Sequence, residues 1–126
     1  MFELLKKVLK PYGPSGNETE VTEVIQRELT GHVDSMTVDA MGNLIVVKKG
    51  TDPNGKKIMI SAHMDHIGFI VTGFEKQGVL RVTSVGGVSA DSNQYRHVVF
   101  GNGMEGVVVS QPLKPGESRA MKHLFI

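Results

Sequence analysis

Three consecutive apolar residues, Ile58-Met59-Ile60, run directly into the sequence Ser61-Ala62-His63-Met64-Asp65-His66-Ile67-Gly68. A half-exposed strand alternates apolar and polar residues, whereas successive apolar residues are typical of a strand that is buried on both faces. The segment therefore predicts an interior strand of a sheet covered by helices. At its end the strand meets a compact group of side chains that can bind metal ions.

His63 and Asp65 are two residues apart, so in an extended backbone both side chains point to the same side while Met64 faces away into packing. An imidazole nitrogen and a carboxylate oxygen are ligands that zinc and cobalt accept. From the spacing alone, a hydrogen-bonded pair of His and Asp that holds no ion is the more common arrangement. His66 is a further candidate, but it points to the opposite side unless the backbone bends from Asp65 onward.

The first thirty residues have a helical period. The pattern of Phe2, Leu5, Val8 and Leu9 predicts a helix that ends before Pro11. A second helix should begin within the next stretch, where Ser15 with Glu18 has the form of a capping box and Asn17 with Glu20 offers an alternative register. The expected core face of this second helix is Val21, Val24, Ile25 and Leu29, and Gly31 should close it.

The period then changes to that of β-structure. Residues 33–38 and 44–47 predict a hairpin, and residues 48–57 a polar loop. After Gly73, short β-prone segments alternate with glycine-bearing turns at 79–82, 95–100 and 106–109. The apolar triplet 124–126 has the character of the opening of a strand. These features predict an α/β part followed by a β-rich part.

The amino-acid composition and charge exclude some classes of function. The hydrophobic share of 40% and the charged share of 21% are those of a folded chain. The net charge is +1, and the lysines and arginines are scattered along the sequence. The sequence therefore shows no basic cluster of the kind that binds nucleic acid or a membrane surface. There is no cysteine, so any metal site must use nitrogen and oxygen donors. The N-terminus is not a signal peptide, and we expect a cytoplasmic protein.

Several segments, in order along the chain, resemble one known family. They are Gly13-Pro14-Ser15-Gly16, Asp39-Ala40-Met41-Gly42-Asn43-Leu44, the segment from Ser61 to Val71, Val85-Gly86-Gly87, and the ending Met121-Lys122-His123-Leu124-Phe125-Ile126. Together they resemble the dinuclear-metal aminopeptidases that include glutamyl aminopeptidase and the tetrahedral aminopeptidases. Some members of that family carry an older endoglucanase label.

The resemblance implies a domain organisation. Residues 1–71 would be the N-terminal part of a metallopeptidase catalytic domain, a mixed sheet covered by helices. Residues 72–126 would be part of a β-rich accessory or dimerisation domain inserted after the metal-binding strand. Members of the family are longer, so we expect the chain to be an N-terminal portion, and the alternative is a small independent domain.

The resemblance also implies roles for site residues. His63 would be a ligand of one of two divalent ions, zinc or cobalt, and Asp65 would be the catalytic-site residue that orients the imidazole ring. His66 stands where the family usually has Glu. Neither Glu75 nor Glu105 matches the family's catalytic glutamate, and both are expected at the surface. The other histidines, expected to be structural or exposed, are His32, His97 and His123.

The implied function is that of a metal-dependent aminopeptidase, which removes N-terminal residues from peptide substrates. The chain alone is expected to be inactive, to bind at most a single ion weakly, and to form a homo-oligomer through its β-rich segment. Two other functions stay open at this point. One is an oligomerisation or binding module without catalysis, and the other is a glycosidase, which would need a pair of carboxylates across a sugar bond.

Overall fold

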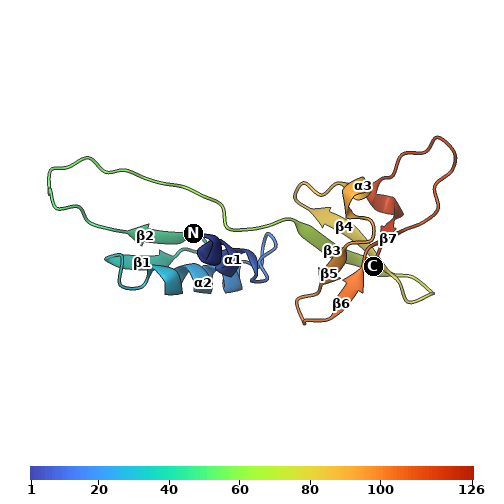
Figure 1. Cartoon of the computed structure of the whole chain (residues 1–126), viewed down its shortest axis with the longest axis horizontal. Coiled ribbons are helices and arrows are strands. Elements are labelled where there is room, and N and C mark those ends of the chain that lie inside the picture. The colour runs from blue at the N-terminus through green and yellow to red at the C-terminus, as the bar shows by residue number, and fades with distance from the viewer. The chain divides into compact units, whose positions relative to one another are not determined.

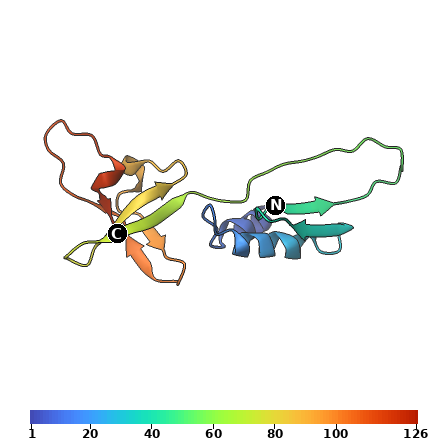
Figure 2. The same cartoon turned by 180° about the vertical axis from the view of Figure 1, so that it is seen from behind.

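The computed structural model describes residues 1–126 and divides into two compact units, Met1–Asp65 and His66–Ile126 (Figure 1). The first unit contains two helices and a hairpin, and the second is built mainly of strands (Figure 2). The fold is α/β, and every strand pairing in it is antiparallel. None of the helices has the length and apolar character needed to cross a membrane.

The two helices predicted for the first unit are confirmed. Helix α1 spans Phe2–Leu9, and helix α2 spans Thr19–Leu29. Val21 of α2 is 1% exposed and is the buried apolar side chain of this unit, whereas the apolar side chains of α1 are largely exposed. Helix α2 ends before Gly31, whose φ of +82° is the left-handed conformation that glycine adopts without strain.

The predicted capping box of α2 is wrong in both registers. The residue before the helix is Glu18, and no side chain caps the first turn. The Glu18 carboxylate accepts a hydrogen bond from the Gly16 backbone N–H at 2.6 Å, and the Glu20 carboxylate accepts one from the Tyr12 N–H at 3.0 Å. Both carboxylates thus bind backbone groups of the preceding loop. The Ser15 hydroxyl does not cap the helix and donates to Asp65 instead.

The predicted hairpin is confirmed as strands β1, Ser35–Val38, and β2, Leu44–Val47. Its turn depends on Asp39. One carboxylate oxygen of Asp39 accepts hydrogen bonds from the N–H groups of Met41 and Asn43, each at 2.9 Å. The other accepts one from the Asn43 amide, also at 2.9 Å. These bonds, led by the one from the Asn43 side chain, hold the pKa of Asp39 below its ordinary value.

The interior strand predicted from Ile58 onward is absent. Residues 56–65 contain no helix or strand, and Ile58, Met59 and Ile60 are 86%, 89% and 91% exposed. A strand needs a hydrogen-bonded neighbour, and the hairpin strands β1 and β2 pair only with each other. The apolar run therefore remains extended and uncovered within this chain.

The second unit contains a four-stranded sheet with the order β3-β4-β8-β7 and a two-stranded sheet, β5-β6. The strands span Gly68–Phe74, Leu80–Val85, His97–Val99, Glu105–Val107, Val109–Ser110 and Leu124–Phe125, numbered β3 to β8 in chain order. The β-prone segments predicted after Gly73, and the strand predicted at 124–126, are thus found. Two short helices, α3 at Ala90–Asn93 and η1 at Met121–His123, are too short to show a sequence period.

The boundary between the two compact units falls between Asp65 and His66. Strand β3 begins at Gly68, runs through residues 71 and 72, and pairs with β4. His63 and Asp65 therefore belong to the first unit and His66 to the second.

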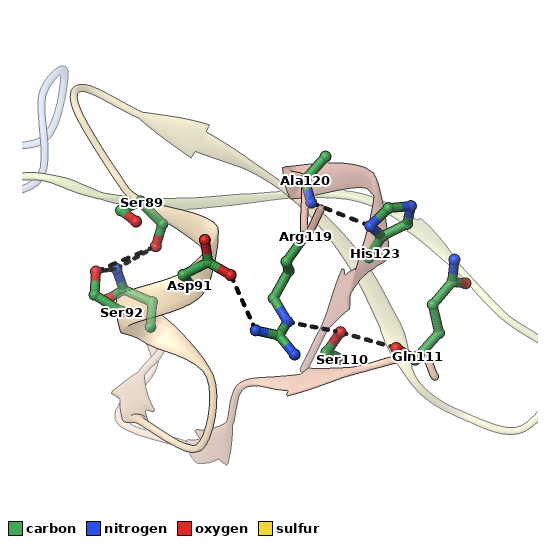
Figure 3. A network of polar contacts seen from close by, with 9 residues as sticks. Ser89, Asp91, Ser92, Ser110, Gln111, Arg119, Ala120 and His123 are labelled. Carbon is green, nitrogen blue, oxygen red and sulfur yellow. Dashed lines mark hydrogen bonds and ion pairs between the residues drawn. The ribbon is translucent and has the colours of Figure 1, made fainter. Parts of the chain in front are cut away.

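The core of the second unit consists of Val82, Val108 and Leu124, at 4%, 0% and 0% exposure. A network of polar contacts links α3, β7 and the segment that precedes β8 (Figure 3). The Nδ1 atom of buried His123 accepts a hydrogen bond from the Ala120 N–H at 3.1 Å, and its Nε2 lies 3.3 Å from Glu117. Arg119 donates to Ser110 at 3.2 Å and to Asp91 at 3.0 Å. His123 therefore holds the residues that lead into β8 through its two ring nitrogens. This is the structural role expected for it from the sequence.

Replacing Leu124 with alanine should destabilise the second unit by about 2–5 kcal/mol, because it removes fully buried side-chain atoms and leaves a cavity. Hydrogen exchange of the β4 and β8 amides would measure the change. Leu9→Ala is the matched control, since it removes the same atoms from a residue that is 69% exposed. An equal loss of protection in the two variants would contradict this description of the core.

The Asp39 turn should be sensitive to acid. Because its pKa is lowered in the folded hairpin, the stabilisation from ionised Asp39 is present above the ordinary carboxyl pKa and is lost as the pH falls through the lowered pKa. The amide signals of Met41 and Asn43 should therefore shift together in an NMR titration at acidic pH. In Asp39→Ala this transition should be missing, and its persistence would assign it to another group.

Candidate metal-binding site

His63 and Asp65 contact each other directly. The His63 Nδ1 atom lies 3.0 Å from the Asp65 Oδ1 atom and 3.0 Å from the Asp65 backbone oxygen. Met64 faces the other way, and its sulfur accepts a hydrogen bond from the Thr22 hydroxyl of α2 at 3.4 Å. The two-residue alternation expected from the sequence is therefore present although these residues belong to no strand.

The partners of His63 determine which of its ring nitrogens carries the proton. Both atoms that face Nδ1 are oxygens that can only accept, so in the neutral ring Nδ1 is protonated and donates to them. The Nε2 atom is then left with its lone pair. Because the His63 side chain is 85% exposed, this lone pair is accessible to a ligand from solvent.

Asp65 is held in its ionised form by hydrogen bonds. Its Oδ2 atom accepts a hydrogen bond from the Ser15 hydroxyl at 2.5 Å, while Oδ1 accepts the bond from His63. Hydrogen bonds from Ser15 first, and from His63 second, lower the pKa of Asp65 from its ordinary value. The carboxylate therefore stays ionised at neutral pH and can polarise the imidazole ring.

His63 and Asp65 together can supply one ligand of a metal site. A neutral imidazole backed by a carboxylate is the usual arrangement of a metal-ligating histidine. The chain brings together no group of three or more His, Asp or Glu side chains that could hold an ion. These residues therefore fit one ligand position and its supporting carboxylate, and a complete coordination shell would need further donors.

The other candidate residues contact different groups or are exposed. The His66 Nδ1 atom lies 3.0 Å from the backbone oxygen of Ile67. His32 and His97 are exposed, as expected. Glu75 forms an ion pair with Arg81 at 2.6 Å, and Glu105 is exposed in β6.

The first unit also has a hollow between the start of α2 and the hairpin. Its lining includes Glu18, Thr22, Glu23 and Val38. Neither His63 nor Asp65 lines it. The His63–Asp65 pair is therefore not part of this hollow.

Comparison with known proteins places the chain in one family. Residues 42–123 match the model of the M42 glutamyl aminopeptidase family. The chain belongs to this family, which confirms the resemblance drawn from its sequence segments.

Individual relatives carry aminopeptidase names. The chain is 50% identical over 108 residues to a putative aminopeptidase of Acetivibrio thermocellus, a match that covers 86% of this chain and 32% of that protein. It is 39% identical over 88 residues to the lysyl aminopeptidase of Pyrococcus furiosus, covering 69% of this chain and 25% of the relative.

Solved structures show the same similarity in three dimensions. An aminopeptidase from the archaeon Desulfurococcus kamchatkensis superposes with a TM-score of 0.84 at 34% identity, covering 98% of this chain and 36% of that one. A Thermotoga maritima structure described as an endoglucanase superposes with a TM-score of 0.79 at 35% identity, covering 97% and 36%. The chain thus spans about a third of the length of the proteins that it matches.

Sequence reasoning found the His63–Asp65 pair but missed Ser15, which it assigned to a helix cap. The two residues of the Ser15–Asp65 hydrogen bond are 50 positions apart, so no local pattern reveals the contact. The only local signal is the turn sequence Pro14-Ser15-Gly16, which indicates a defined backbone but not the partner of the hydroxyl.

The proton position in His63 can be measured directly. In the neutral ring, ¹⁵N NMR of the chain should find Nδ1 protonated and Nε2 unprotonated, because only acceptors face Nδ1. His32, which is exposed and has no side-chain hydrogen bond, is the internal reference for a ring that exchanges between both forms. A His63 ring protonated on Nε2 would contradict the site geometry.

Proposed function

We propose that this chain supplies one metal ligand and its supporting carboxylate to the active site of a metal-dependent aminopeptidase. The observation that carries the proposal is the exposed His63 ring, whose Nδ1 is bound by Asp65 and whose Nε2 lone pair is accessible. Membership of the M42 glutamyl aminopeptidase family supports it.

In this proposal each residue has a defined task. His63 would offer Nε2 to the ion, and Asp65 would keep Nδ1 protonated and the ring in a fixed orientation. When bound, a divalent ion supplies Lewis acidity, which polarises a peptide carbonyl and lowers the pKa of water. Zinc and cobalt both suit a nitrogen and oxygen donor set, which is the only kind this cysteine-free chain can offer.

The proposed substrates are peptides with a free N-terminus. Relatives of the chain are named for different terminal residues, lysyl in one case and glutamyl in another. A glycosidase is not favoured, because relatives such as those of Acetivibrio thermocellus and Pyrococcus furiosus carry aminopeptidase names, although a solved neighbour is described as an endoglucanase. We propose a cytoplasmic location because the chain contains no cysteine.

We also propose that the protein forms a homo-oligomer through its second unit, with no nucleic-acid or membrane partner. Strand β3 is an edge strand of its sheet and exposes Ile70 at 55% and Phe74 at 84%. Exposed apolar side chains on a sheet edge favour association. A similar structure, the TET1 peptidase of Pyrococcus horikoshii, is described as assembling into a tetrahedron or a large octahedral shell.

The proposed function can be tested in a chimera. The matched residues of this chain would replace their counterparts in the Acetivibrio thermocellus putative aminopeptidase, to which it is 50% identical. The chimera should hydrolyse amino-acid anilides with added zinc or cobalt. His63→Ala should lower this rate by at least about 100-fold, since loss of a ligand costs more than the 10- to 100-fold typical of its supporting residues.

His32→Ala is the matched control, because it removes an exposed imidazole from the same unit and should leave the rate unchanged. The 126-residue chain alone should show no turnover, since it brings together no group of three metal-binding side chains. Hydrolysis by the chimera that survives His63→Ala would refute the proposed function, as would a folded chimera without activity.

A further inference from the structure

The Asp65 carboxylate is bound at both of its oxygens. Oδ1 accepts from His63 Nδ1 at 3.0 Å, and Oδ2 accepts from the Ser15 hydroxyl at 2.5 Å. A carboxylate bound at one oxygen can still rotate, because the terminal torsion of an aspartate side chain has broad preferences. A second bond at the other oxygen restricts this rotation and so fixes the plane of the carboxylate.

Ser15 is itself held in place by a defined turn. The Asn17 N–H donates to the Pro14 oxygen at 2.8 Å, and Gly16 has a φ of +88°. A positive φ at the third residue is what a type II turn requires, and glycine adopts it without strain. Ser15 is the second residue of this turn, so its backbone is fixed where its hydroxyl meets Asp65.

Hydrogen bonds connect this turn and the residues before it to the start of helix α2. The Glu18 carboxylate accepts from the Gly16 N–H at 2.6 Å, and the Glu20 carboxylate accepts from the Tyr12 N–H at 3.0 Å. On the other side of the motif, Thr22 of the same helix donates to the Met64 sulfur. Helix α2 therefore supports the His63–Asp65 segment at two places.

These bonds matter because the segment forms no strand of its own. Residues 61–65 lie in no strand, so no backbone ladder fixes the direction of their side chains. The contacts of Asp65 and Met64 with the turn and the helix take over that role.

We propose that Ser15 is a positioning residue of the metal site, which acts through Asp65 to orient the His63 ring toward an ion. The proposal rests on the proposed function, since it assigns Ser15 to the support of the same ligand. The task of the hydroxyl is to donate its proton to Asp65 Oδ2, so that Oδ1 stays directed at His63 Nδ1.

The first experiment uses the 126-residue chain, and its readout is zinc binding, not enzymatic activity. Zinc would be titrated into ¹⁵N-labelled protein, and the shift of His63 Nε2 would report binding. Ser15→Ala should weaken zinc binding by about tenfold, the lower end of the range for residues that support a metal-ligating histidine. Three-bond couplings should also show that the Asp65 side chain samples more than one rotamer in this variant.

Two further variants separate positioning from a general structural effect. Ser15→Thr keeps the hydroxyl and should restore most of the zinc affinity, which is feasible because Ser15 is exposed. Ser35→Ala makes the same change at an exposed serine of β1 and should leave zinc affinity unaltered. Unchanged zinc affinity and Asp65 rotamer in Ser15→Ala would overturn the proposal, and so would a failure of Ser15→Thr to restore binding.

The second experiment places the same variants in the chimera with the Acetivibrio thermocellus protein. A positioning role predicts that Ser15→Ala lowers kcat by about tenfold at saturating metal with a smaller change in KM. If Ser15→Ala retains full activity while His63→Ala is inactive, the proposal for Ser15 fails and the proposed function stands. If His63→Ala is also active, the proposed function itself fails.

Discussion

The contact on which the candidate site depends is the sharing of one carboxylate between two donors. Asp65 accepts from Ser15 at Oδ2 and from His63 at Oδ1, and so joins a turn near the start of the chain to a ring 48 positions further on, at His63. A hydrogen bond to an ionised acceptor is stronger than one between neutral groups. The pair of bonds therefore defines the ring orientation more firmly than the exposed position of His63 would suggest.

The contact between His63 and Asp65 could be predicted from the sequence because it follows from local backbone geometry. His63 and Asp65 converge because residues two apart share a side in any extended backbone, and this holds although the expected strand is absent. The burial of Ile58 could not be predicted in the same way. Successive apolar residues indicate that a segment is suited to the interior of a sheet, but the neighbouring strands must be supplied from elsewhere, and β1 and β2 pair only with each other.

Ser15 illustrates a second limit of local patterns. A serine three residues before a glutamate fits a capping box, yet here Glu18 binds Gly16 and the serine hydroxyl binds Asp65. In a capping box the serine oxygen would accept a hydrogen bond from a backbone N–H, whereas here the hydroxyl donates to the ionised Asp65 carboxylate, and hydrogen bonds to a charged group are the stronger kind. Because that acceptor lies 50 residues away, only the folded chain reveals the choice. The short strand at 124–126 is similar, since its β-character was predicted but its place between β4 and β7 was not.

The two units differ in how their structure is maintained, and this explains why polar contacts are so important at the site. The second unit has a buried cluster of Val82, Val108 and Leu124, and the buried ring of His123, next to Leu124 in the chain, lies 3.3 Å from Glu117. The first unit buries Val21 alone among its apolar side chains, so dispersion and apolar burial fix its loops only weakly. A ligand histidine must nevertheless be held within a fraction of an ångström of its working position. In a unit with so small a core, hydrogen bonds from helix α2 and its preceding turn are the interactions able to provide that precision.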